Sequence, residues 1–431
     1  MKPWAMRQSR IFFLCAVVSG LRIPEPLLRR TVHAAPQRRL ATPLKLQPRR
    51  ATVLLSGAPG EERGGSIQLY PSRWLHLGYL SLLALLSDWV CFSVAAAPET
   101  WVSTYAHDPA TLIDIFLFTN VLFCFLEPTI VRKIGLRGCV VGAGMLMSVG
   151  CALRSGVPLS GAVPPYAEVV AGTVLVGAAQ PFFQCTPPLL SATWFGADER
   201  ALATAVAINF NQVGIATAFL VGGAMAGSTE GLAQYFDLIT LLSVLVATGA
   251  FLQFQERPPT PPSSSMAAKM LEESKNPQPA PNFVDESRKL LAVPGFTRAL
   301  AAFVVSIGVS NVLSAFIEET LLSSGVTAQE TIDFAGAGFQ AAIVLGGIVL
   351  GGYVDRTKRY KLVTQSCLFA SLLLVLPLGL STASTPVVLG TLIALGALIG
   401  PVQPINAELA VEVSYPAGMP RACGDAHGTI Y

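Results

Sequence analysis

The feature that most constrains this chain is a series of apolar blocks, each about 20 residues long, that recur from Trp74 onward. A helix of about 20 apolar residues is long enough to cross the roughly 30 Å hydrocarbon core of a bilayer. Charged residues make up only 13% of the sequence, against about 25% in soluble globular proteins. The pattern therefore predicts an integral, multi-pass α-helical membrane protein embedded in the lipid bilayer and excludes a soluble enzyme.

Ten membrane spans are expected, separated by a polar linker after the sixth. The spans cover residues 75–97, 110–131, 136–154, 164–190, 201–223, 234–254, 297–321, 331–353, 362–381 and 386–413. The linker contains PPTPPSSS and NPQPAPN, a composition that cannot bury a core. The predicted organisation is a leader over 1–73, a six-helix half over 74–254, a cytoplasmic linker over 255–295 and an incomplete four-helix half over 296–431.

The leader has two parts with different compositions. Basic residues precede a short apolar run, 11–20, as in a signal peptide, and the stretch after it is rich in Arg and Thr and poor in acids, as in a transit peptide. We predict targeting to a plastid or another organelle membrane. The alternative is a disordered basic tail or an over-long gene model, and a plasma-membrane location is then expected.

Charge in the short loops predicts the orientation of the spans. Lys and Arg follow the even-numbered spans, whereas the intervening loops 98–109, 224–233 and 322–330 contain neither. Short loops rich in Lys and Arg face the cytoplasm or its topological equivalent. Arg154, at the end of span three, is the exception to this pattern.

The two halves also show a repeat. Span two runs into LEPTIVRKIGLRG and span eight into GGYVDRTKRYK, while spans four and ten each contain a GT pair, at 172–173 and 390–391, and then become proline-rich. Parallel repeats of six helices are the plan of the major facilitator superfamily. The predicted fold class is therefore an all-α polytopic membrane bundle of the major facilitator type, with about 10 of 12 transmembrane helices present.

Polar residues inside the spans are candidates for a substrate site, because they are costly at bilayer depth. Asp88 precedes Trp89 in span one, and an acid beside an indole can attract an ammonium group. Gln180 and Gln184 lie one turn apart in span four, among prolines that break the helix. The alternatives are packing of Trp89 between helices, pairing of Asp88 with another span and simple kinking of span four.

Two further spans carry candidate residues. Glu408 and Glu412 share one face of span ten, although Glu412 could instead be solvated at the cytoplasmic interface. Asn311 belongs to a polar stripe in span seven, beyond which Glu318 and Glu319 follow, and such stripes often only join helices. At the cytoplasmic ends we predict a conformational latch made of charged residues, namely Asp355, Arg356, Arg359, Arg132, Asp198 and Arg200.

Known catalytic and metal-binding patterns are missing from the sequence. It contains no GxxxxGK[ST] phosphate loop and no GxSxG or HExxH motif. The eight cysteines and four histidines are dispersed without metal-ligand spacing. We therefore predict that the protein is not an enzyme and has no cofactor or metal, and that transport is facilitated or coupled to another gradient.

One stretch, QPFFQCTPPLLSATWFGADERALATAVAINFNQVGIA (180–216), resembles the feline leukaemia virus subgroup C receptor-related transporters of solute carrier family 49. GGYVDRTKRYK and AELAVEVSYP are similar to the same family, and the likeness covers about 73–423. The resemblance implies a site made of a span-one Trp, matched by Trp89, a span-four Gln, matched by Gln180, and a span-ten Glu, matched by Glu408 or Glu412. In two respects the chain departs from the family: Asp88 replaces a polar uncharged residue, and the sequence ends before spans eleven and twelve, which predicts a truncated gene product.

The resemblance implies handling of choline or ethanolamine, with haem export also attributed to the family. We therefore expect a monomeric transporter of a small organic cation that works by alternating access and does not bind nucleic acid. The alternatives are a haem exporter or a transport-inactive membrane receptor or scaffold.

Overall fold

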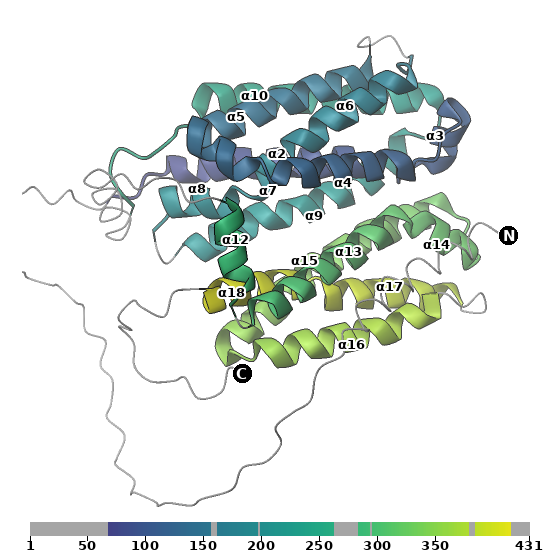
Figure 1. Cartoon of the computed structure of the whole chain (residues 1–431). Coiled ribbons are helices and arrows are strands. Elements are labelled where there is room, and N and C mark those ends of the chain that lie inside the picture. Colours follow the sequence, from purple (N-terminus) through teal and green to yellow (C-terminus); the bar gives the residue numbers. More distant parts are fainter. Residues whose placement is uncertain are drawn as a thin grey trace, which may run out of the picture. The chain divides into compact units, whose positions relative to one another are not determined.

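The computed structural model describes residues 68–156, 162–196, 199–262, 283–293, 295–378 and 384–414. Within these ranges the regular structure is entirely helical, as the sequence predicts (Figure 1). The leader prediction falls almost wholly outside the described residues, as does most of the predicted linker.

The helices before the linker carry the first six predicted spans. They are α2 (Ser72–Phe92), α3 (Pro98–Tyr105), α4 (Ala110–Cys124), α5 (Glu127–Ser155), α6 (Tyr166–Ala179), α7 (Pro181–Gln184), α8 (Pro187–Trp194), α9 (Arg200–Met225) and α10 (Thr229–Gln253). Span four is divided into α6, α7 and α8, and a proline stands at the start of both α7 and α8. Because proline lacks a backbone N–H, each one removes a helical hydrogen bond at these junctions.

The helices after the linker form a second group, drawn in green to yellow in Figure 1. They are α13 (Phe296–Ala315), α14 (Ile317–Ser323), α15 (Gln329–Thr357), α16 (Tyr360–Leu378), α17 (Thr385–Ile399) and α18 (Val402–Ser414). Helix α12 (Phe283–Leu291) lies inside the predicted linker, 255–295, which is therefore helical in this part. Predicted span seven, 297–321, is too long, because α13 ends at Ala315 and α14 begins as a separate short helix.

Eight helical segments among the described residues are long and apolar enough to cross a membrane, and Ala110–Cys124 and Tyr360–Val375 are shorter apolar helices. These ten segments coincide with the ten predicted spans. Predicted span two, 110–131, overran its helix, because the chain turns after Cys124 and α5 begins at Glu127. Gly135 interrupts α5 with a φ of 76°, a left-handed conformation that glycine adopts without strain.

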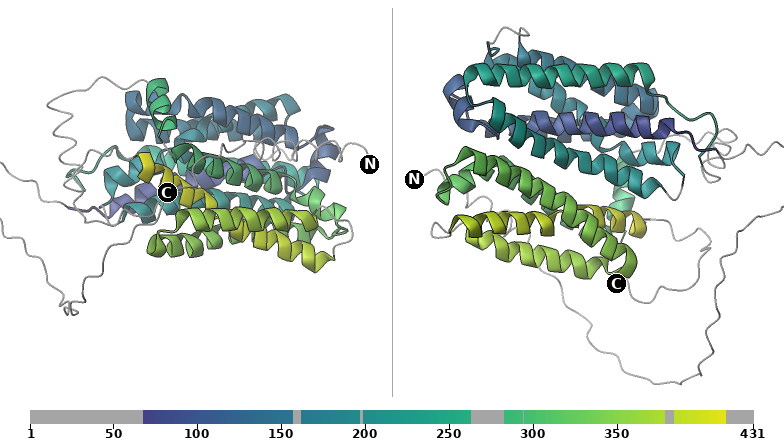
Figure 2. Two further views of the ribbon diagram at one scale, coloured as in Figure 1. Left: turned by 60° about the horizontal axis from the view of Figure 1, so that its bottom comes forward. Right: turned by 180° about the vertical axis from the view of Figure 1, so that it is seen from behind.

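Close helix contacts at glycines hold the bundle together. A β-carbon on Gly214 of α9 would lie 2.2 Å from the Leu85 carbonyl oxygen of α2, and one on Gly346 of α15 would lie 2.2 Å from the Ala397 carbonyl oxygen of α17. Helix α9 also packs against α15, so the helices before and after the linker are in direct contact. Glycine at positions 214 and 346 therefore allows the helix backbones to approach closely. Figure 2 shows the two groups of helices from behind and with the bottom of the Figure 1 view turned forward.

The WFG motif that supports the family resemblance packs in the core. Trp194 at the end of α8 is 1% exposed, and its ring centroid lies 4.1 Å from that of His76 in α2. Phe195 packs edge-on against Trp74, with ring centroids 5.1 Å apart. The motif thus joins the end of span four to the start of span one and does not face a ligand.

Candidate substrate site

The site begins with two residues near the end of α2. Both lie in a segment apolar enough to cross a membrane, and both are buried: Asp88 is 6% exposed and Trp89 is 5% exposed. The Gln180 side-chain amide donates a hydrogen bond to the Asp88 carboxylate, with 2.7 Å between Nε2 and Oδ1. Spans one and four are therefore joined at two candidate residues, and this is the pairing of Asp88 with another span that the sequence analysis gave as the alternative to a substrate site.

Helix geometry at the α6–α7 junction positions Gln180. This residue is the N-cap of α7 and precedes Pro181, the first residue of that helix. Proline provides no N–H for the carbonyl of Gly177, four residues earlier. Gly177 itself approaches α4 closely, since a β-carbon there would lie 2.8 Å from the Phe116 carbonyl oxygen. The buried amide of Gln180 thus lies at this junction, within reach of α2.

The Trp89 indole is fixed by a residue that sequence reasoning missed. Its Nε1 donates a hydrogen bond to the Tyr235 hydroxyl of α10 at 2.7 Å, and the two ring centroids lie 6.3 Å apart. Tyr235 is fully buried. A tyrosine in an apolar span is typical of core packing, so no signal in the sequence separates it from other aromatic residues. The contact fixes the orientation of the indole ring, one residue after Asp88 in α2.

Two polar atoms of this cluster have no hydrogen-bond partner. They are Asp88 Oδ2 and Gln180 Oε1. Both are acceptors, and a buried acceptor without a donor costs roughly 1–3 kcal/mol, more when it is charged. A positively charged or hydrogen-bond-donating ligand would satisfy them.

Gln184, the other predicted residue of span four, does not join this cluster. Gln184 is exposed and accepts a hydrogen bond from Asn120 Nδ2 of α4 at 3.3 Å. Asn311 lies on α13, and Glu408 and Glu412 lie on α18, which packs on α13, α15 and α16. The side chains of Glu408 and Glu412 are outside the described residues. Among the predicted site residues whose side chains the structure describes, Asp88 and Gln180 are in contact, and Trp89 is the next residue along α2.

Arg154, the exception to the loop-charge pattern, is a buried residue that links helices of the first half. It is 3% exposed, and its guanidinium donates hydrogen bonds to the hydroxyls of Thr173 and Ser93. The guanidinium carbon also lies 5.2 Å from the ring centroid of Phe236. These contacts tie α5 to α6, α10 and the end of α2. The role of this residue is thus to hold the helices that carry the candidate site.

Of the predicted latch residues, Arg356 and Arg359 are exposed, and Arg132 donates to the Pro128 carbonyl oxygen. Arg200 donates to the carbonyl oxygens of Phe195 and Ala192. Asp198 lies outside the described residues, as does the side chain of Asp355. The predicted latch stays a prediction.

Other contacts of charged residues hold this end of the bundle. Arg73 at the start of α2 forms an ion pair with Glu199, with 3.0 Å between Nε and Oε2. The Glu256 carboxylate accepts hydrogen bonds from the backbone N–H groups of Leu136 and Arg137, at 2.9 and 2.7 Å. A carboxylate at a helix N-terminus satisfies free N–H groups and complements the helix dipole.

A bundle of membrane-crossing helices with a buried polar cluster beside a broken span is the architecture of a transporter. A profile of the Major Facilitator Superfamily matches residues 77–424, so the chain belongs to that superfamily. The predicted fold class is thereby confirmed.

Curated relatives confirm the resemblance to solute carrier family 49. The chain is 26% identical over 379 residues to Solute carrier family 49 member A3 of Xenopus tropicalis, covering 85% of this chain and 77% of the relative. It is 28% identical to a Solute carrier family 49 member 4 homolog of the same species, with 87% and 85% covered. It is 26% identical to the Choline/ethanolamine transporter flvcr2a of Danio rerio, with 81% and 76% covered.

Solved transporters share the fold at low sequence identity. A bacterial homologue of the human lysosomal transporter Spinster, inward-facing and unoccupied, aligns with a TM-score of 0.60 and 17% identity, covering 79% of this chain and 76% of that chain. A D-xylose–proton symporter aligns with a TM-score of 0.58 and 13% identity, covering 78% and 86%. At these identities the likeness concerns the fold alone.

Proposed function

We propose that this protein transports a small organic cation, such as choline or ethanolamine, by alternating access. The observation that carries the proposal is the buried hydrogen bond between Gln180 and Asp88, one residue before Trp89, whose indole is held by Tyr235. A carboxylate supplies the counter-charge for an ammonium group, and an indole face attracts the same group by roughly 0.5–2 kcal/mol. A relative whose name is choline/ethanolamine transporter supports this choice of substrate class.

Each residue of the cluster has a specific role in this proposal. Asp88 provides the charge, Trp89 the aromatic face, and Gln180 holds the carboxylate until the substrate arrives. Because Asp88 Oδ2 has no hydrogen-bond partner, a cation can bind that oxygen while Gln180 keeps the other one. Glu408 and Glu412 of α18 are proposed as acids that the second half contributes when the halves rock.

Uptake of labelled choline by vesicles that carry the full chain tests this function. Wild type should show saturable uptake, and Trp89→Ala should lower it by about 3- to 30-fold, the range that a cation–π contact of this strength supplies. Trp89→Phe keeps an aromatic face and should fall between the two. Trp74→Ala, at a tryptophan that is 42% exposed at the start of the same helix, is the matched control and should transport normally.

Rates are compared per amount of folded protein, because truncating a buried tryptophan also destabilises the bundle. Absence of saturable choline and ethanolamine uptake by the folded wild type would contradict the proposal. Equal uptake by wild type and Trp89→Ala would show that Trp89 is not part of the substrate site.

A further inference from the structure

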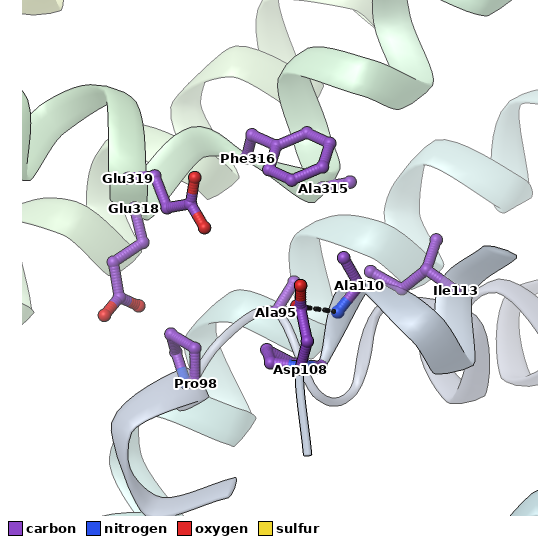
Figure 3. Close-up of a pocket in the computed structure, with 10 residues that line it drawn as sticks. Ala95, Pro98, Asp108, Ala110, Ile113, Ala315, Phe316, Glu318 and Glu319 are labelled. Carbon is purple, nitrogen blue, oxygen red and sulfur yellow. Dashed lines mark hydrogen bonds between the residues drawn. The ribbon is translucent and has the colours of Figure 1, made fainter. Parts of the chain in front are cut away.

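A small acidic cavity lies between the two groups of helices, at the end of the bundle predicted to face away from the cytoplasm. Its wall includes Ala95 and Asp108 from the first group and Phe316, Glu318 and Glu319 from the second (Figure 3). The cavity has a volume of about 20 Å³, which holds about one water molecule. It therefore lies where the halves must part if this end opens.

Glu318 differs from the other acids of this cavity in its burial. It is 4% exposed, and its Oε2 atom has no hydrogen-bond partner. Glu319, its neighbour in α14, is exposed, and Asp108 accepts a hydrogen bond from the Ala110 backbone N–H at 2.9 Å. A buried carboxyl with an unpartnered oxygen is costly as an anion, so this site favours a proton or another cation.

The charged groups around Glu318 are acids. Glu99 of α3, Asp333 of α15 and the adjacent Glu319 repel its negative charge. Glu318 lies beyond the candidate span Phe296–Ala315. Burial, together with this repulsion, raises its pKa from 4.5 to about 7, although a hydrogen bond with Gln329 acts in the opposite direction. The carboxyl thus titrates near neutral pH when it is buried here.

The same residues take part in contact between the halves. Gln329 Nε2 donates to the Ala96 carbonyl oxygen, at the end of span one, at 3.3 Å and to Asp333 Oδ1 at 3.1 Å. Helices α9 and α15 pack together, and a β-carbon on Gly223 of α9 would collide with the Asp333 carboxylate. Glu318 and Asp333 are therefore buried while this end is closed.

The dimensions of the cavity decide which cation fits. Space for about one water molecule is too small for an organic ammonium ion such as choline. Among the described residues, no group of three or more His, Cys, Asp or Glu side chains is arranged to hold a metal ion. A proton on the carboxyl group fits the space and removes the buried charge.

We propose that Glu318 is a proton-binding site and that its protonation holds the two halves closed at this end. The inference rests on alternating access, one part of the proposed function, and is independent of which substrate is carried. When this end opens, water reaches Glu318 and its pKa returns toward its usual value of 4.5. The closed form therefore gains stability as pH falls through about 7 and loses it as pH rises, because the buried anion is then unfavourable.

Labelling of an introduced cysteine with a membrane-impermeant maleimide tests this proposal without any substrate. Labelling of Ala95→Cys measures how accessible the cavity is to water. The labelling of the chain that lacks this introduced cysteine is subtracted as background. Gly227→Cys, at an exposed position where a side chain meets no atom within 4 Å, provides the reference for the pH dependence of the thiol chemistry. The normalised labelling of Ala95→Cys should rise at least about threefold between pH 6 and pH 8, with a midpoint near 7, since one pKa unit is a tenfold change in equilibrium.

Variants of the acids then identify the titrating group. When Glu318→Gln is added to the Ala95→Cys chain, labelling should stay low at every pH. Glu330 is an exposed acid in the first turn of α15, and Glu330→Gln should leave the pH dependence of labelling unchanged. Asp333→Asn should shift the midpoint to lower pH, and it tests the proposal if Glu318→Gln does not fold. The proposal would be overturned if labelling of the Ala95→Cys chain did not depend on pH. It would also be overturned if adding Glu318→Gln or Asp333→Asn left the pH dependence of labelling unchanged.

Discussion

The two polar regions of this protein differ in where their residues come from. Asp88 and Gln180 belong to helices of the same half and share a 2.7 Å hydrogen bond. Asp108 and Glu318 come from different halves and line one cavity. Contacts inside one half persist when the halves rock, whereas contacts between halves form and break. The first region is therefore suited to hold a ligand throughout the cycle, and the second to sense whether one end is closed.

The largest expected effect comes from disrupting the contact between α9 and α2, the helix that carries Asp88. Gly214→Leu places a side chain where the Leu85 carbonyl oxygen of α2 lies 2.2 Å from the β-carbon. Overpacking of this kind typically costs about 1–3 kcal/mol and sometimes more, so the midpoint of thermal unfolding in detergent should fall by several degrees.

Gly142→Leu in α5 is the matched control for this change. A β-carbon at Gly142 meets no atom within 4 Å, so the same substitution should leave the unfolding midpoint nearly unchanged. Equal effects at both positions would show that the close contact of α2 and α9 does not decide the stability of this half.

A smaller effect separates the two regions from each other. Tyr235→Phe removes the hydroxyl that accepts the Trp89 indole hydrogen bond, an interaction worth about 1 kcal/mol. The apparent KM for choline should rise about fivefold while the pH dependence of labelling at Ala95→Cys stays the same. A shifted labelling curve with an unchanged KM would mean that Tyr235 acts in closure and not in binding.

The spans could be predicted because each is a long apolar block that must bury its backbone polar groups in a helix. Their ends were harder to place. Nothing at Ala315 or Phe316 resembles a helix stop, since neither proline nor glycine is present, and predicted span seven accordingly ran through the junction of α13 and α14. Helix ends of this kind depend on tertiary packing more than on local sequence.

The candidate site was predictable where a polar residue stands alone in an apolar span. Asp88 and Gln180 are conspicuous for this reason, and the structure places them in contact. Tyr235 was not predictable, because its role depends on the partner of its hydroxyl. Glu318 was visible only as an acid beyond the polar stripe of span seven. Its burial results from the approach of α3 and α15, which no local pattern indicates.

The most direct test of the central claim is equilibrium binding to the purified protein by choline and by its neutral isostere 3,3-dimethylbutanol, in which carbon replaces the charged nitrogen. If Asp88 supplies the counter-charge, wild type should bind choline at least about tenfold more tightly than the isostere, a difference of roughly 1.4 kcal/mol. Asp88→Asn, which keeps the size of the side chain, should remove most of this preference and leave the affinity for the isostere unchanged. The same preference for choline in folded Asp88→Asn would contradict the account.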